Sequence, residues 1–339
     1  GVCDVGGCHG GPPQRCRVPE CGSVLMKGTG KGRVPLRVAI VGAGKVGTVL
    51  GRVLVEEGAR ITAVVSRSRS SARSAASFLR CRTYADALTA IPPETDIIFI
   101  TTPHDAVAGV ASTLARLEGL EFGRMGACHA SGMLTASVLE PLEERGSRVF
   151  SFHPLQTFPR GFSPRRIVPL ARGIWYGADG SRAGLRMARR LARTLRGHVI
   201  EVPPEFRELY HATCVVASNH LTVLLSVIRE MYGGVRREER PHLEPFRPII
   251  EATILNVFAT SPASALSGPV ARGGVETVAK HLDAVRGSLP VLLPYFTRMT
   301  LETVRLAVAG GALTPERREA LENLVMSYTQ DPPPIGNRQ

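Results

Sequence analysis

Six residues near the start of the chain have the types and spacing of a diphosphate-binding turn. They are Gly42, Ala43, Gly44, Lys45, Val46 and Gly47, and they follow an apolar run at 38–41 and lead into a periodic apolar segment at 46–55. In such a turn the first glycine allows a tight bend, the second lets the backbone approach a pyrophosphate, and the third lets helix and strand pack closely. The amide groups that open the helix carry partial positive charge. The sequence therefore predicts a dinucleotide site, with an ordinary glycine-rich turn as the alternative.

The residues after the second expected strand, 61–65, indicate which dinucleotide is bound. NAD-binding chains usually place a carboxylate about 20 positions after the glycines, where it binds the ribose 2′-hydroxyl. This chain has Ser66, Arg67 and Ser68 there, followed by Arg69, with no carboxylate nearby. Hydroxyl and guanidinium groups suit a 2′-phosphate, so NADP is preferred over NAD. A solvated basic loop is the alternative.

Polar residues follow three further expected strands, at 96–101, 126–129 and 148–152. The carboxyl ends of parallel strands share one edge of a sheet, and that edge holds the ligand in open α/β folds. We expect four of these residues to lie beside the cofactor, namely Thr102, Pro103, His104 and His129. We expect Ser131 and Gln156 to lie beside a substrate, and His153 to be a second candidate proton donor.

A polar stripe on a long apolar helix, 205–231, completes the candidate chemistry. Its members are spaced by 4, 3 and 4 residues and share one helix face: Arg207, His211, Cys214 and Ser218, with Asn219 beside them. Hydride transfer requires a proton or hydrogen bond at the reacting heteroatom, and histidine titrates near working pH. We therefore take His211 as first choice for general acid and expect Ser218 and Asn219 to bind the reacting oxygen or nitrogen. Arg207 and Arg272 are expected to bind a substrate anion, while core or surface roles are the alternative for each residue.

The elements that must position these residues form two domains. Strands alternate with helices over residues 36–203, with further short strands at 174–176 and 198–202, as is typical of a doubly wound sheet. Pro203 and Pro204 then interrupt the chain, and residues 204–330 contain only helical patterns, at 205–231, 243–258, 275–285, 292–308 and 315–328. Thr314 and Pro315 form a good helix start.

Composition limits the function classes. The chain has 339 residues and a formal net charge of +13, with only four lysines among 42 basic residues. The arginines are scattered, and no aromatic platform accompanies them, so we expect no nucleic-acid partner. No uncharged apolar run approaches the ~18 residues of a membrane span, so we expect no membrane association and a cytoplasmic protein.

Four of the seven cysteines lie within the first 21 residues: Cys3, Cys8, Cys16 and Cys21. Four thiols so close together could bind zinc, but their spacing is not that of common zinc sites. The segment is rich in Gly and Pro and lacks apolar periodicity. We therefore predict no metal site, a disordered leader over residues 1–35 and a disordered tail over 331–339.

Four segments carry a resemblance to a known family, and they read HASG (129–132), FHPLQTF (152–158), LYHATCVVASNHL (209–221) and SGPVARGG (267–274). With the glycine turn, they resemble the Rossmann-like proteins that carry domain of unknown function 2520. These are similar to a superfamily that includes pyrroline-5-carboxylate reductase, ketopantoate reductase, prephenate dehydrogenase and 6-phosphogluconate dehydrogenase. The resemblance implies a Rossmann-like NADP domain followed by an all-helical domain like that of 6-phosphogluconate dehydrogenase.

The resemblance also bears on individual residues. His153-Pro154 resembles the His-Pro segment that lies close to substrate in prephenate dehydrogenases. Relatives often have a Lys before the L-Y-H segment, where this chain has Arg207, which can hold an anion but donates a proton poorly.

Together these observations predict an NADP-dependent oxidoreductase that reduces a C=O or C=N bond of a small, carboxylated metabolite. We expect a homodimer, because all-helical second domains often bury apolar faces against a twin. A non-catalytic NADP sensor and a deazaflavin-linked NADP oxidoreductase are the alternatives.

Overall fold

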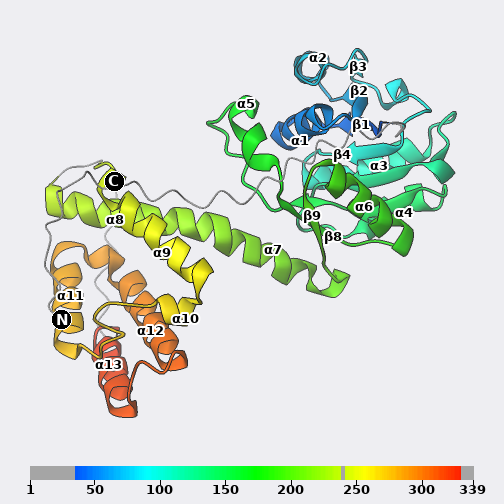
Figure 1. Cartoon of the computed structure of the whole chain (residues 1–339). Coiled ribbons are helices and arrows are strands. Elements are labelled where there is room, and N and C mark those ends of the chain that lie inside the picture. The colour runs from blue at the N-terminus through cyan, green and yellow to red at the C-terminus, as the bar shows by residue number, and fades with distance from the viewer. Residues whose placement is uncertain (1–34, 238–240, 330–339) are drawn as a thin grey trace, which may run out of the picture. The chain divides into compact units, whose positions relative to one another are not determined.

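The chain divides into two compact units, Gly1–Ile200 and Glu201–Gln339. The computed structural model describes residues 35–237 and 241–329 (Figure 1). The expected leader lies outside the described residues except for Pro35, and so do the four N-terminal cysteines within it. The expected tail also lies outside them.

The first unit is built on a six-stranded parallel sheet in the order β3-β2-β1-β4-β5-β6. Its strands are β1 (Arg37–Val41), β2 (Arg60–Val65), β3 (Tyr84–Ala85), β4 (Ile97–Ile100), β5 (Gly126–His129) and β6 (Arg148–Ser151). The four residues of β4 are all buried, as expected for a strand that is covered on both faces. The predicted Rossmann-like doubly wound sheet is therefore confirmed.

Helices cover both faces of this sheet. One apolar core contains side chains of α1 (Lys45–Glu56), α2 (Arg69–Phe78) and α6 (Arg182–Thr194). The other contains side chains of α3 (Val107–Ala115) and α4 (Glu140–Glu143). Short 3₁₀ turns lie at η1 (Leu88–Ala90), η2 (His104–Ala106), η3 (Phe122–Arg124) and η4 (Ala136–Leu139).

The short strands expected near residues 174 and 198 do not extend the main sheet. They form β8 (Trp175–Ala178) and β9 (His198–Glu201) of a separate three-stranded sheet, in the order β7-β8-β9. Its first strand, β7 (His153–Pro154), pairs antiparallel with β8. Between them lie α5 (Pro164–Ile167) and η5 (Val168–Ala171). The Tyr176 ring stacks on Phe152, with ring centroids 4.2 Å apart, and joins this sheet to the core below it.

After the last residue of β9, the described residues of the second unit form only helices and the loops between them. It contains η6 (Pro204–Phe206), α7 (Arg207–Val215), the π-helical turn η7 (Val216–His220), α8 (Leu221–Arg236), η8 (Glu244–Phe246), α9 (Arg247–Ala259), α10 (Pro262–Ala265), α11 (Val275–Ser288), η9 (Pro290–Leu292), α12 (Leu293–Ala309) and α13 (Pro315–Ser327). Side chains of α11, α12 and α13 form its apolar core. The predicted helix start is confirmed, because the Thr314 hydroxyl accepts the Arg317 amide at 3.4 Å.

The stretch Pro204–Arg236 is a nearly continuous helix of 33 residues with a window of mean hydropathy 1.4. By length and composition alone it could cross a membrane, contrary to the expectation that no segment would qualify. One such helix is weak evidence for a membrane span.

Candidate functional site

The glycine turn follows β1 and opens α1, and two of its glycines are required by their surroundings. Gly42 has a φ of 111°, and a Cβ there would lie 2.7 Å from the carbonyl carbon of Thr101. A Cβ at Gly47 would lie 2.3 Å from the Thr101 hydroxyl oxygen and 2.6 Å from the Gly42 carbonyl oxygen. The Thr101 hydroxyl donates to the same Gly42 carbonyl at 2.8 Å. The turn is thus fixed by contacts with the end of β4.

Gly44 differs from the other two glycines. A Cβ there would meet only the Thr101 carbonyl oxygen, at 4.0 Å, so the folded chain leaves room for a side chain at this position. Gly44 is the N-cap of α1, no side chain caps the helix, and its first turn has no acidic residue. The helix therefore opens on free space with uncompensated positive partial charge.

A second feature of this edge is the Thr102 hydroxyl. Its oxygen is buried and has no hydrogen-bond partner among the described residues. Such a group is costly to bury unless something bonds to it, which makes it a ready partner for a ligand. The open space at Gly44 and this orphan hydroxyl both fit a bound dinucleotide, as does the uncapped helix start. Pro103 and His104 follow directly and are exposed.

Lys45 does not point into the turn. Its ammonium group donates to the carbonyl oxygens of Pro159 and Arg160, far along the chain. The loop after β7 is thereby tied to the first residue of α1. Sequence spacing gave no indication of this contact, because it joins residues more than a hundred positions apart.

The end of β2 lacks a carboxylate, as expected. Arg67 and Ser68 are exposed, and the Ser68 hydroxyl accepts the Ser71 amide at 3.3 Å as the N-cap of α2. Ser66 donates its amide to the Ala85 carbonyl at 3.1 Å, so β3 ends beside it. The exposed Asp86 follows Ala85. Sequence reasoning missed this carboxylate because it considered only the strand that follows the glycine turn.

His129, at the end of β5, is fully buried, and both of its ring nitrogens have backbone partners. Nδ1 accepts the Ser131 amide at 3.2 Å, so the ring proton lies on Nε2 and is donated to the Thr135 carbonyl at 3.0 Å. The Ser131 hydroxyl accepts the amides of Met133 and Leu134, both at 3.3 Å. These bonds order the loop after β5.

A buried carboxylate that the sequence analysis missed also holds this loop. Asp179 is 5% exposed and directly follows β8. It accepts the Ala136 amide at 2.7 Å and the Ser151 hydroxyl, while its own amide donates to that hydroxyl oxygen at 2.9 Å. The ends of β6 and β8 and the start of η4 are therefore joined at one carboxylate.

The FHPLQTF segment contributes two polar side chains of the candidate site, His153 and Gln156. His153 is half-buried in β7. The Gln156 amide donates to the Leu170 carbonyl at 2.7 Å, and its oxygen accepts the Thr157 amide at 2.7 Å. In this structure Gln156 therefore supports its own loop.

In the second unit, the polar stripe does lie on one face of the long helix. Arg207 is buried, and His211, Cys214 and Ser218 are half-buried, whereas most residues around them are exposed. The Arg207 guanidinium lies 5.5 Å from the centroid of the Tyr210 ring.

The π-helical turn η7 contains Ser218 and the exposed Asn219. The Ser218 hydroxyl lies 2.7 Å from the Cys214 carbonyl, to which it donates, and 3.0 Å from the Asn219 amide oxygen. Such π turns are frequent at functional sites. Sequence reasoning did not predict one here.

Arg272 is exposed in a loop that begins at Gly268 and ends at Gly273, both of which have positive φ. Among the described residues no group of three or more His, Cys, Asp or Glu side chains could hold a metal ion.

Comparison with known families identifies both parts of the chain. The Rossmann-like domain model matches residues 26–154, and the model of domain of unknown function 2520 matches residues 174–303. The chain thus combines these two domains, as the four sequence segments suggested. No curated protein matches the sequence significantly.

Solved structures share this fold at low sequence identity. A candidate NADP oxidoreductase from Bacteroides fragilis has a TM-score of 0.63 at 20% identity, over 80% of this chain and 98% of its own. A protein from Thermotoga maritima has a TM-score of 0.60 at 21% identity over the same shares. A reductive aminase from Aspergillus terreus, solved with NADPH and ethyl-5-oxohexanoate, has a TM-score of 0.51 at 14% identity, over 88% of this chain and 94% of its own.

Proposed function

We propose that this chain, which joins a Rossmann-like domain to a DUF2520 domain, is an NADP-dependent oxidoreductase that reduces a C=O or C=N bond of a small, carboxylated metabolite. The observation that carries the proposal is the open cradle at the start of α1. Gly44 leaves free space there, and no side chain caps the helix. A pyrophosphate in that space would accept hydrogen bonds from the helix amides. The orphan Thr102 hydroxyl lies in the segment that follows β4, the strand whose end contacts the turn.

We propose NADP in preference to NAD because of the residues after β2. Arg67 and Arg69 are exposed and have no ion-pair partner among the described residues, so both are available to a 2′-phosphate. Two of the solved structures that share the fold carry NADP or NADPH in their names.

The bound nicotinamide would supply a hydride to the carbon of the C=O or C=N bond. We propose that His211 donates the proton to the heteroatom, with His153 as second candidate. Ser218 and Asn219 would hold that atom. Arg207, Ser131, Gln156 and Arg272 would hold the rest of the substrate, with the guanidinium groups binding its carboxylate in bidentate fashion. The exposed His104 would line the cofactor, whereas the buried His129, which we expected beside it, would act by ordering the loop after β5.

The first experiment is direct titration of the purified protein with NADPH and NADH, followed by fluorescence or calorimetry. We expect NADPH to bind more tightly, and Arg67→Gln with Arg69→Gln to weaken NADPH about tenfold while leaving NADH nearly unchanged, because only NADPH carries the 2′-phosphate. Absence of NADPH binding by the wild-type protein would remove the foundation of the proposal.

The second experiment tests catalysis with a panel of keto acids and imines. We expect His211→Gln to lower kcat by about 10²-fold without changing the NADPH dissociation constant, as for loss of a general acid. If His153→Gln lowers kcat instead, the two roles are exchanged.

The position of Arg207 favours a second candidate function, a non-catalytic NADP sensor. Arg207 is 1% exposed and stands where relatives often have Lys, and a guanidinium donates protons poorly. Tight NADPH binding without turnover, by both the wild-type protein and Arg207→Lys, would favour the sensor. Turnover by Arg207→Lys alone would show that the site can catalyse the reaction and that the arginine at position 207 prevents it.

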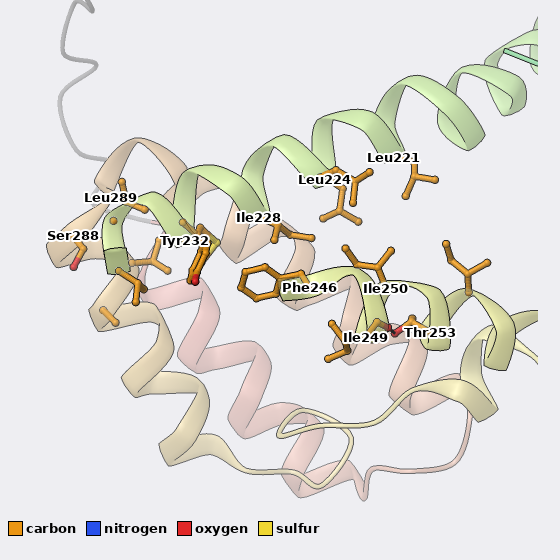
Figure 2. Close-up of a pocket in the computed structure, with 17 residues that line it drawn as sticks. Leu221, Leu224, Ile228, Tyr232, Phe246, Ile249, Ile250, Thr253, Ser288 and Leu289 are labelled. Atoms are coloured by element: carbon orange, nitrogen blue, oxygen red, sulfur yellow. Dashed lines mark hydrogen bonds between the residues drawn. The ribbon is translucent and has the colours of Figure 1, made fainter. Parts of the chain in front are cut away.

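We also propose that two copies associate through the helical unit. An apolar groove of about 710 Å³ lies along α8, α9 and the end of α11. Figure 2 shows the side chains that line it. Leu221, Ile249 and Ile254 line it and are 40%, 65% and 41% exposed. Apolar patches of this kind usually mark an interface, and the same face of a second copy would cover it.

A further inference from the structure

A positively charged trough lies in the first unit, away from the glycine turn. It has a volume of about 850 Å³ and is lined by residues of α1, α2 and α5–η5. α1 packs against α2, α5 and η5, so its outer face forms the floor. Arg52 on this floor lies seven residues after Lys45, about 10 Å along the helix axis. The trough is therefore separate from the start of α1, where the dinucleotide is proposed to bind.

Four arginines and one carboxylate supply the charge of the trough. Glu56 is held between two of them. The Arg52 Nε lies 2.7 Å from the Glu56 Oε1, and Arg172 pairs with the other carboxylate oxygen. Arg52 also donates to the Phe78 carbonyl at 3.1 Å, which fixes its guanidinium at the floor. These bonds neutralise Glu56 and leave the trough with an excess of positive charge.

The other two arginines, Arg80 and Arg165, are exposed and have no ion-pair partner among the described residues. They come from different elements, since Arg80 follows α2 and Arg165 lies in α5. Arg80 has a φ of 55°, a left-handed conformation that ends α2 and determines where this side chain leaves the backbone. Two uncommitted guanidinium groups on one trough are suited to the oxygens of a phosphate.

The remaining lining gives the trough both polar and apolar character. Ser74 and Ser77 add hydroxyl groups from α2, while Phe78, Val168 and Pro169 add apolar surface. A volume of this size is within the range of small-molecule sites, about 300–1,000 Å³. A free inorganic anion would use only the charged groups, whereas an organic phosphate would also cover the apolar wall.

We propose that this trough binds a small phosphate ester with an apolar body, independently of the dinucleotide. Arg80 and Arg165 bind the phosphate oxygens, the serine hydroxyls add hydrogen bonds, and the side chain of Phe78 contacts the apolar body. The ligand is a second molecule, so it remains able to bind when the glycine turn is filled.

The test is calorimetric titration of the full chain with phenyl phosphate and with inorganic phosphate, in the presence and absence of saturating NADPH. We expect phenyl phosphate to bind more tightly than phosphate, with or without NADPH. Arg80→Gln with Arg165→Gln should weaken phenyl phosphate by about tenfold. The matched control, Arg67→Gln with Arg69→Gln, removes the same charge at the other end of α2 and should leave that affinity within about twofold.

Several results would overturn the proposal. Equal weakening by both double variants would indicate a general electrostatic field, and competition with NADPH would place the phosphate at the glycine turn. Absence of phenyl phosphate binding by the wild-type protein would exclude the proposed site. Because NADPH affinity is measured in the same variants, failure of the dinucleotide proposal is seen separately. Thermal unfolding midpoints establish that both variants are folded.

Discussion

At the scale of single residues, the glycines of the turn have two different roles. Gly42 and Gly47 are required by the fold, whereas Gly44 leaves space that we assign to a ligand. We expect Gly47→Ala to destabilise the protein by about 1–3 kcal/mol, because its methyl group would overlap the Thr101 hydroxyl and the Gly42 carbonyl. Gly44→Ala should change stability by less than about 0.5 kcal/mol but weaken NADPH about tenfold, because the methyl group would occupy the space of the pyrophosphate.

Urea unfolding and NADPH titration of the same two variants check this contrast. Gly58→Ala is not a suitable control, since Gly58 has a φ of 87° and would be strained. Gly109 is better, because a Cβ there meets nothing within 4 Å and its φ is not positive. If Gly44→Ala bound NADPH as tightly as the wild-type protein, the pyrophosphate would not occupy the space at Gly44.

Tyr176 is a second residue with an unexpected environment. Its ring is fully buried against Phe152, but its hydroxyl has no hydrogen-bond partner among the described residues, and burial raises the pKa of the phenol. Tyr176→Phe should therefore leave stability unchanged or raise it by about 1 kcal/mol, since it removes an unsatisfied polar group. Tyr328→Phe is the contrasting variant, because the Tyr328 hydroxyl donates to Asp283 at 2.7 Å. A clear loss of stability in Tyr176→Phe would reveal a hidden partner.

At the scale of elements, one ion pair joins the starts of the two central strands. Asp96, just before β4, accepts the backbone amide of Arg37 in β1 at 2.9 Å and pairs with its guanidinium at 2.9 Å. Burial alone would raise the pKa of Asp96, but the hydrogen bonds and charge of Arg37 lower it below its ordinary value. The two strands are thereby aligned at the edge opposite the glycine turn.

This pair predicts a pH-dependent contribution to stability. Because the pKa of Asp96 is lower in the folded state, its contribution is complete above the unfolded pKa of about 3.9 and is lost as pH falls through the folded pKa. Asp96→Asn should cost about 1 kcal/mol at pH 7, a value reduced for partial exposure, and clearly less at about pH 2, where protonation of the carboxylate has begun to remove the ion pair. Urea unfolding at the two pH values measures it, and an equal cost at both would refute the ionic origin.

At the scale of the whole molecule, the helical unit exposes large apolar side chains, whose contact with water is unfavourable. Phe258 is 86% exposed and Ile249 is 65% exposed, both on α9. We expect light scattering to give twice the 36.4 kDa of one chain. Ile249→Glu with Ile254→Glu, both in the groove lining, should give a monomer, because unpaired carboxylates cannot be buried at a symmetric interface.

A matched control for this pair is Leu170→Glu with Trp175→Glu. Both residues are similarly exposed, at 58% and 49%, but lie in the first unit. A monomeric wild-type protein would refute the proposed dimer. Dissociation by the control pair alone would show that the dimer forms through another surface.

Features that depend on local periodicity could be predicted from the amino-acid sequence. Buried parallel strands are continuous apolar runs, so β1, β4 and β5 were visible without their partners. The glycine turn was recognisable because each glycine has a local task between a strand and a helix. The Thr314 cap was visible for the same reason, since its bond spans three residues. The predicted roles of the site residues and the expected cytoplasmic location remain predictions.

Which polar side chains already have hydrogen-bond partners could be seen only in the folded chain. Lys45 bonds to Pro159, Gln156 to Leu170, and Asp179 to Ala136, and each bond joins residues that sequence spacing does not relate. The assignment of β8 and β9 to a separate sheet has the same cause, because strand pairing is a contact between distant segments. Residue type gives the chemistry that a side chain can perform, but only the folded chain determines which partner it meets.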